Sequence, residues 1–175
     1  MGTLTQNIFF VGFMGVGKTT LVRKLARSLN VASVDTDLFV ERKFGRSPAR
    51  VFKDEGETAF RVLEQQALAD CVNMGPLLIS TGEGIVDKPE NCEMISQHGF
   101  VIYLHADMQS SLARIKSVRT RPLFLDQDNI EALWDKRVVK YEALADVVVD
   151  VEGKGTGHIV NEVEAILMKQ GLFTP

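Results

Sequence analysis

The sequence has little cysteine, no surplus of positive charge and no long hydrophobic run. Only two of its 175 residues are cysteines, and Cys71 and Cys92 form neither a CxxC pair nor a group with neighbouring histidines. We therefore expect no disulfide framework, no zinc site and a reduced, cytoplasmic setting. The formal net charge of −3 indicates no nucleic-acid partner, because binding to nucleic acid needs clustered Lys and Arg.

Membrane insertion and secretion are not expected either. No segment reaches the roughly 18 uninterrupted apolar residues of a membrane-spanning helix, and the first residues, MGTLTQN, lack the features of a secretory signal. What the chain does have is 45% apolar and 25% charged residues. This composition is typical of one soluble globular domain, which we expect to span residues 1–175 and to be monomeric.

Short apolar runs rich in Val, Ile, Leu and Phe alternate with stretches of helical spacing. The apolar runs predict strands at 7–12, 31–35, 77–81, 100–105 and 146–151. Examples of the helical stretches are 19–29 and 131–145. The alternation predicts an α/β fold of three layers, in which a five-stranded parallel sheet is covered by helices on both faces.

Two stretches break this alternation. The segment 39–70 has helical spacing but is interrupted by Gly45, Pro48 and Gly56. The segment 118–129 is polar, basic and interrupted by Pro122. Because such insertions often carry function, we expect both to contribute to a site.

A phosphate-binding motif follows the first predicted strand. Residues 12–19, GFMGVGKT, match GxxxxGK[ST] between a predicted strand and a predicted helix. Glycines let backbone N–H groups converge on phosphate oxygens, and the positive end of the following helix favours an anion. Lys18 is expected to reach the β- and γ-phosphates of ATP, and Thr19 to offer its hydroxyl to Mg²⁺. The alternative is a glycine-rich turn that merely joins strand to helix. The predicted ATP-binding residues of this loop are Gly12, Gly15, Val16, Gly17, Lys18, Thr19 and Thr20.

Two carboxylates follow the second predicted strand, in Asp35-Thr36-Asp37. In an extended segment alternate residues point the same way, so both carboxylates would face one cleft at the carboxyl end of the strand. One could serve a metal and the other an acceptor. Alternatively, the pair caps the next helix, because Asp is common at N-caps.

A P-loop alone indicates nucleotide binding, since ATPases, GTPases and kinases share it. Further motifs, however, make the sequence resemble the shikimate kinase family, in the family's order and through nearly the whole chain. The motifs are GFMGVGKT, DTD, GRSPARVFKDEGETAFRVLE, TGEG, RTRPL and DKRVVKY. The resemblance implies a P-loop kinase fold like that of nucleoside monophosphate kinases, with an acceptor-binding segment at about 35–65 and a lid at about 115–128. It also implies ATP-dependent phosphorylation of the 3-hydroxyl of shikimate, a step of chorismate and aromatic amino acid biosynthesis, with Mg²⁺ as cofactor.

The resemblance implies that two arginines hold the carboxylate of shikimate. These are Arg61, in the FRxxE pattern, and Arg137, near which Val139 stands where the family usually has proline. Guanidinium groups suit this role because they bind carboxylates through paired, charge-assisted hydrogen bonds. Each arginine could instead be a solvated surface residue.

Four further roles follow from the same resemblance. Asp37 would contact the reacting hydroxyl and take its proton late, while Asp35 would lie near Mg²⁺ through water. Arg121 would close with the lid over the phosphates, where it and Lys18 would neutralise charge during transfer. Arg114 would stack on adenine, a reasonable place for a cation. Each of these arginines also has the surface alternative.

The clearest departure from the family lies after the third predicted strand. The family has three consecutive glycines beside the substrate, and this chain has Gly82-Glu83-Gly84. A carboxylate about 5 Å from that of the acceptor would repel it by on the order of 3 kcal/mol at an effective dielectric constant near 20. Glu83 could turn outward or pair with a cation, the acceptor could differ, or Glu83 could serve Mg²⁺ as a Walker-B-like acid. We expect the first, because the other acceptor motifs are in place. The predicted acceptor-binding residues are Asp37, Arg61, Gly82, Glu83, Gly84 and Arg137.

Two other functions remain open. The chain could be a P-loop kinase of another small hydroxy acid or a nucleoside, or a nucleotide-binding protein whose catalysis is lost. Acceptor-dependent release of ADP distinguishes the three: shikimate, another hydroxy compound, or nothing would stimulate it.

Overall fold

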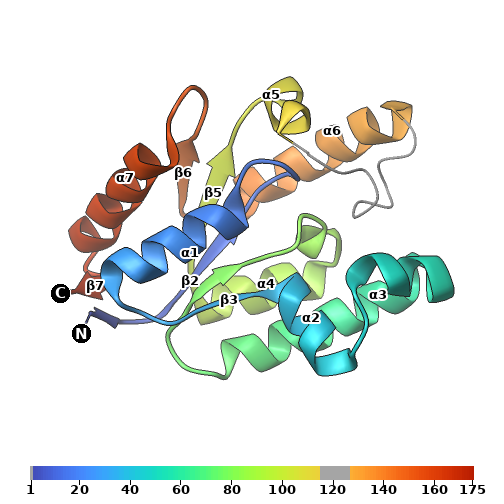
Figure 1. Cartoon of the computed structure of the whole chain (residues 1–175), viewed down its shortest axis with the longest axis horizontal. Helices are drawn as coiled ribbons and strands as arrows, with labels where there is room; N and C mark the ends of the chain where they lie inside the picture. Colours follow the sequence, from blue (N-terminus) through green and yellow to red (C-terminus); the bar gives the residue numbers. More distant parts are fainter. Residues whose placement is uncertain (1, 115–126) are drawn as a thin grey trace.

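The computed structural model describes residues 2–114 and 127–175. Five parallel strands form one sheet in the order β3-β4-β2-β5-β6, which confirms the predicted sheet (Figure 1). In the register of this sheet, Phe9 of β2 lies opposite Ile79 of β4 and Val101 of β5. The strands are β2 (Asn7–Val11), β3 (Ser33–Asp35), β4 (Leu78–Ser80), β5 (Gly99–His105) and β6 (Val147–Asp150).

Helices cover both faces of the sheet, as the alternation of strands and helices predicted. Alternate residues of β2 point to opposite sides: Phe10 packs with α1 (Lys18–Leu29) and α7 (Thr156–Lys169), and Phe9 packs with the helices of the other face. Those helices are α3 (Pro48–Val72), α4 (Pro89–His98) and α6 (Gln127–Leu144). Both phenylalanines are fully buried, and burial of one such ring stabilises the fold by roughly 1.5–3 kcal/mol.

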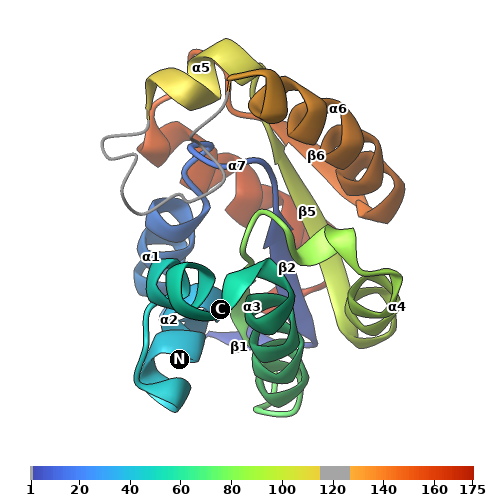
Figure 2. The same ribbon diagram turned by 90° about the vertical axis from the view of Figure 1, so that its right-hand side faces the viewer.

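The first insertion folds as a helical pair beside the sheet. Gly45 ends α2 (Thr36–Phe44), Pro48 begins α3, and Gly56 interrupts α3 with a kink. The two helices lie side by side in both ribbon views (Figures 1 and 2). They share a small core of their own, made of Val40, Val51, Phe60 and Ala67. This core fixes the orientation of α3, which carries Arg61 next to Phe60.

Short elements complete the described chain. β1 (Thr3–Leu4) pairs antiparallel with β7 (Phe173–Thr174), so the two ends of the described chain lie together. A 3₁₀ turn, η1 (Ile85–Asp87), follows β4, and α5 (Met108–Ala113) follows β5. No helix of the described ranges is long and apolar enough to span a membrane.

Most of the predicted lid, at about 115–128, lies outside the described residues. Arg121, which is predicted to act from the lid, falls in that stretch. The helix α6 begins at Gln127, inside the predicted range. The last two residues of the predicted lid are therefore helical.

Candidate active site

The phosphate loop has the backbone that its sequence predicted. Gly12, Gly15 and Gly17 adopt positive φ angles of 154°, 79° and 97°, which residues other than glycine rarely adopt. Gly17 directly precedes α1, so the first N–H groups of this helix face the loop. The buried ammonium group of Lys18 donates to the carbonyls of Gly12 at 2.6 Å and Phe13 at 3.1 Å. The side chain of Lys18 is thus held by two backbone carbonyls of its own loop.

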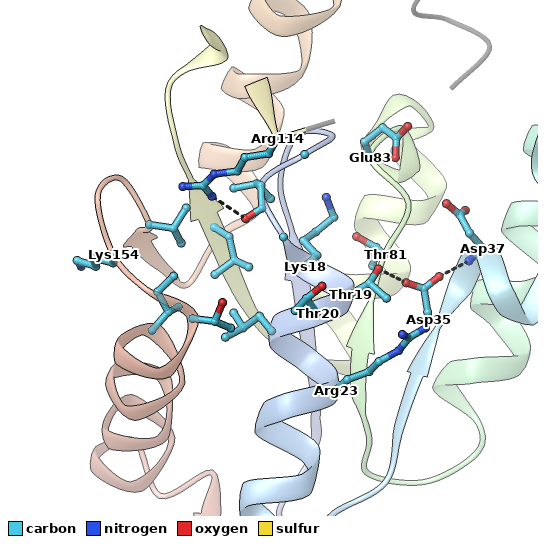
Figure 3. Close-up of a pocket in the computed structure, with 18 of the residues that line it drawn as sticks. Lys18, Thr19, Thr20, Arg23, Asp35, Asp37, Thr81, Glu83, Arg114 and Lys154 are labelled. Carbon is cyan, nitrogen blue, oxygen red and sulfur yellow. Dashed lines mark hydrogen bonds between the residues drawn. The ribbon is translucent and has the colours of Figure 1, made fainter. Parts of the chain in front are cut away.

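A cavity of about 680 Å³ lies over this loop (Figure 3). It collects most of the residues that the sequence predicted for ATP and the metal, and two of those predicted for the acceptor. Gly12 does not line it; it supplies the carbonyl that holds Lys18. The predicted residues that line the cavity are Gly15, Val16, Gly17, Lys18, Thr19, Thr20, Asp35, Asp37, Glu83 and Arg114.

The far wall of the cavity was not predicted from the sequence. That wall comes from the loop between β6 and α7, with Lys154, Gly155 and Thr156. The signal was present, because a glycine-rich turn at the carboxyl end of a parallel strand is a common place for a ligand. Thr81, the first residue of TGEG, and Arg23 also line the cavity, but only Arg23 lies outside every quoted motif.

The two aspartates of DTD reach the cavity by a different geometry from the one expected. Asp37 lies in the first turn of α2 and not in an extended segment, so the expectation of alternating side chains is wrong. Asp35 caps that helix: its Oδ1 accepts hydrogen bonds from the backbone N–H groups of Asp37 at 3.0 Å and Leu38 at 3.2 Å. The cap starts the helix at this point and turns Asp37 toward the cavity (Figure 3).

The second oxygen of Asp35 meets the phosphate loop. The hydroxyl of Thr19 donates to Asp35 Oδ2 at 2.7 Å, so Asp35 is both a helix cap and a neighbour of Thr19. A hydroxyl and a carboxylate are oxygen ligands of the kind that Mg²⁺ prefers. No group of three or more His, Cys, Asp or Glu residues in 2–114 and 127–175 could hold a metal alone. A magnesium ion here would therefore depend on phosphate oxygens and water, which is its usual mode beside a P-loop.

Two buried arginines meet next to the cavity. Arg61 is 8% exposed and donates from Nη1 to Glu64 Oε1 at 2.9 Å and from Nη2 to Glu57 Oε1 at 3.2 Å. Arg137 is 0% exposed and donates from Nε and Nη2 to the two oxygens of Asp87, at 3.3 and 2.9 Å. Asp87 Oδ2 also lies 3.8 Å from Arg61 Nη2. The surface alternative is therefore wrong for both arginines.

The carboxylates around these arginines have shifted pKa values. Burial would raise the pKa of Asp87, but the hydrogen bond and charge of Arg137, together with the charge of Arg61, lower it below its ordinary value. Burial raises the pKa of Glu64, which is 1% exposed, and Arg61 only partly opposes this. Asp87 is thus ionised at neutral pH.

The TGEG turn, residues 81–84, passes through this cluster. The side chains of the cluster lie close to both glycines of the turn. A Cβ on Gly82 would lie 2.8 Å from Asp37 Oδ1 and 2.9 Å from Glu64 Oε2, and one on Gly84 would lie 2.3 Å from a nitrogen of Arg61. A side chain at either position would therefore displace the charged ends of Asp37, Glu64 or Arg61 from where they lie. Asp87 and Glu64 were not among the predicted site residues. Glu64 ends the FRxxE pattern and could have been included, whereas Asp87 lies in no motif.

Glu83 lies between these glycines and does not turn away from the site. Its side chain lines the cavity. Burial is the main cause of the raised pKa of Glu64, and the negative charge of Glu83 adds to it. Burial would lower the pKa of Arg137, but nearby negative charges, that of Glu83 among them, raise it. The backbone carbonyl of Glu83 accepts a hydrogen bond from the buried hydroxyl of Tyr141 in α6. The part of our expectation in which Glu83 turns outward is therefore wrong.

Arg114 lies beside the phosphate loop. It is exposed, and its Nη1 donates to the carbonyl of Val16 at 3.4 Å (Figure 3). This position at the rim of the cavity is compatible with contact to a nucleotide base, which stays a prediction.

Comparison with known proteins gives one consistent result. A family model described as shikimate kinase matches residues 14–167. The shikimate kinase of Francisella tularensis subsp. novicida is 33% identical over 173 residues, covering 97% of this chain and 98% of that protein. Among solved structures, shikimate kinase from Acinetobacter baumannii in complex with shikimate aligns with a TM-score of 0.90 and 29% identity over 95% of both chains. Shikimate kinase from Aquifex aeolicus aligns with a TM-score of 0.82 and 32% identity over 95% of this chain and 98% of that one. This chain therefore belongs to the shikimate kinase family of ATP-dependent kinases, as its motifs predicted.

Proposed function

We propose that this chain transfers the γ-phosphate of ATP to the 3-hydroxyl of shikimate, giving shikimate 3-phosphate and ADP. The observation that carries the proposal is the meeting of two buried arginines, Arg61 of α3 and Arg137 of α6, beside the phosphate-loop cavity. A pair of guanidinium groups suits the carboxylate of a small acid. The product is an intermediate of chorismate and aromatic amino acid biosynthesis.

ATP would occupy the cavity of about 680 Å³. Its phosphates would lie against the N–H groups at the start of α1, where the helix dipole favours negative charge. Lys18 would exchange its bonds to the loop carbonyls for bonds to phosphate oxygens. Thr20, Arg114 and the loop around Gly155 would contact the remainder of the nucleotide.

Phosphoryl transfer needs mainly an aligned acceptor and neutralised charge. Asp37 lines the cavity close to the TGEG turn, where it would orient the acceptor hydroxyl and take its proton late. Lys18 would neutralise charge on the transferred group, and Arg121 would add to this from the lid. Magnesium, held by Thr19 directly and by Asp35 through water, would supply further positive charge at the phosphates.

We further propose that residues 1–175 act as one domain and as a monomer. In it, the segment at about 35–65 would bind the acceptor and the stretch at about 115–128 would close over it. Closure would exclude water, which competes as an acceptor of the phosphoryl group.

A coupled assay of ADP release tests the proposal. The panel would contain shikimate, the methyl ester of shikimate, quinate and a nucleoside, each with MgATP. Shikimate is expected to stimulate ADP release most, and the ester much less because it lacks the charge that the arginines bind. If shikimate does not stimulate the release of ADP, the proposal is wrong.

One observation favours a second candidate, a kinase of a less anionic acceptor. Glu83 brings a negative charge into the cavity where the family has glycine. Preference for the ester or for another neutral hydroxy compound in the same panel would support this candidate.

A further inference from the structure

We propose that Asp87 is a positioning residue for the acceptor: it holds one edge of the Arg137 guanidinium, so that the rest of that group is presented to the acceptor's carboxylate. The inference rests on the proposed kinase activity. It adds a residue that the family motifs quoted above do not contain.

The geometry of the guanidinium group supports this division. Arginine can bind a carboxylate along the Nε–Nη2 edge or along the Nη1–Nη2 edge. Asp87 occupies the first edge, with Nε to Oδ1 at 3.3 Å and Nη2 to Oδ2 at 2.9 Å. A substrate carboxylate can then approach only from the Nη1 side.

Nη1 of Arg137 is a donor without an acceptor in the described structure. It is buried, and no residue in 2–114 or 127–175 accepts a hydrogen bond from it. A buried donor of a charged group that stays unsatisfied is costly. The acceptor's carboxylate would supply the missing partner and complete the environment of Arg137, which is 0% exposed.

Asp87 also draws the second arginine to the same point. Its Oδ2 lies 2.9 Å from Arg137 Nη2 and 3.8 Å from Arg61 Nη2. Two guanidinium groups repel each other, and a carboxylate between them reduces that repulsion. One aspartate can therefore keep both arginines together before any substrate binds.

Other charges near Arg137 would compete for it if Asp87 were lost. Glu83 and Glu64 both interact electrostatically with Arg137. Lys140 lies 4.0 Å from Asp87 Oδ1 and would lose its partner. Without the aspartate, we expect the Arg137 guanidinium to turn toward Glu83 or Glu64 and away from the acceptor.

The helix itself would stay in place. One turn after Arg137, the hydroxyl of Tyr141 donates to the backbone carbonyl of Glu83. This contact joins α6 to the TGEG turn without using Asp87. A change at Asp87 should therefore alter the orientation of Arg137 more than the packing of α6.

Two substitutions separate charge from geometry. Asp87→Asn keeps the shape and removes the charge, while Asp87→Glu keeps the charge and displaces it by one methylene. Both are expected to raise the KM for shikimate by about tenfold or more, with kcat and the KM for ATP changed by no more than about twofold. Because Asp87→Glu leaves no uncompensated charge beside Arg137, it keeps the test open if Asp87→Asn fails to fold. Asp70→Asn, which removes a carboxylate that pairs with Lys43 on the surface, is the control.

A double-mutant cycle tests whether Asp87 acts through Arg137. On an Arg137→Met background, Asp87→Asn should change kcat/KM for shikimate by less than about twofold, because there is no guanidinium left to orient. An equal loss on both backgrounds, or an unchanged or lower KM for shikimate in the single variants, would overturn the inference. Absence of shikimate-dependent activity in the unaltered protein would instead refute the proposed function.

Discussion

At the nucleotide end of the site one unbroken segment, residues 12–19, forms the phosphate loop, whereas at the acceptor end the charged groups come from α3, η1 and α6. The first end presents mainly backbone N–H groups and a single buried lysine. The second presents side chains that already bond to one another, such as Arg137 with Asp87. Backbone N–H groups are suited to binding phosphate, which all P-loop proteins share. Paired side chains are suited to recognising one particular acid.

This comparison predicts that changes at the nucleotide end will affect kcat and that changes at the acceptor end will affect the KM for shikimate. The largest effect is expected at Lys18. Lys18→Met should lower kcat by about a thousandfold, since it removes the charge placed for the transferred phosphoryl group. Coupled ADP release would measure this, and circular dichroism would verify the fold. Near-normal turnover would contradict the role of the P-loop lysine.

The next largest effect is expected at the acceptor end. Arg61→Ala should weaken binding of shikimate by about 2–4 kcal/mol, because it removes one buried charged partner and leaves Glu64 unpaired. Binding of ATP should barely change. Titration calorimetry would measure both affinities below the unfolding temperature of the variant. Arg50→Ala, which removes an exposed arginine paired with Asp54, should change neither; an equal effect of the two substitutions would remove Arg61 from the site.

Asp37 and Asp35 lie where the two ends meet, and they are predicted to differ. Asp37→Asn should lower kcat by about a hundredfold with little change in nucleotide affinity, because it weakens the group that orients the acceptor and takes its proton. Asp35→Asn keeps a capping oxygen for α2 and should instead raise the Mg²⁺ concentration needed for activity. Magnesium titrations of both variants would test this, and identical responses would reject separate roles.

The smallest effect is expected from the residue that departs from the family. Glu83→Gly should lower the KM for shikimate by about tenfold, or about 1.4 kcal/mol, because it removes a negative charge from the acceptor end. The KM for ATP should change less. Glu83→Gln keeps the bulk and removes only the charge, so an equal gain in both variants would identify repulsion as the cause. No gain in either would mean that the charge of Glu83 is already compensated.

Much of the fold could be predicted because its signals are local. After Asn7, the run IFFV is apolar at every position, which indicates a strand buried on both faces, and all four of these residues are buried in β2. Gly45 and Pro48 mark the end of α2 and the start of α3. The helix beginning at Thr36 was predicted only as an alternative, since an extended pair of carboxylates was the preferred interpretation of DTD.

Fewer of the residues of the candidate site could be predicted from the sequence. The structure places Lys18, Thr19, Asp35 and Asp37 around one cavity, and their roles stay predictions. Asp87 escaped notice because its local sequence, IVDKP, has no motif. Its importance depends on α6, a distant segment of the chain that delivers Arg137 to it.

By itself, the sequence determined the family, the alternation of strands and helices, and the phosphate loop, because each of these depends on residues that are neighbours in the chain. Only the tertiary structure decided which charges meet: that Asp87 lies between Arg137 and Arg61, and that Glu83 lines the cavity. The physical reason is that a charge acts on whatever lies within a few ångströms of it, and the packing of distant helices sets those neighbours.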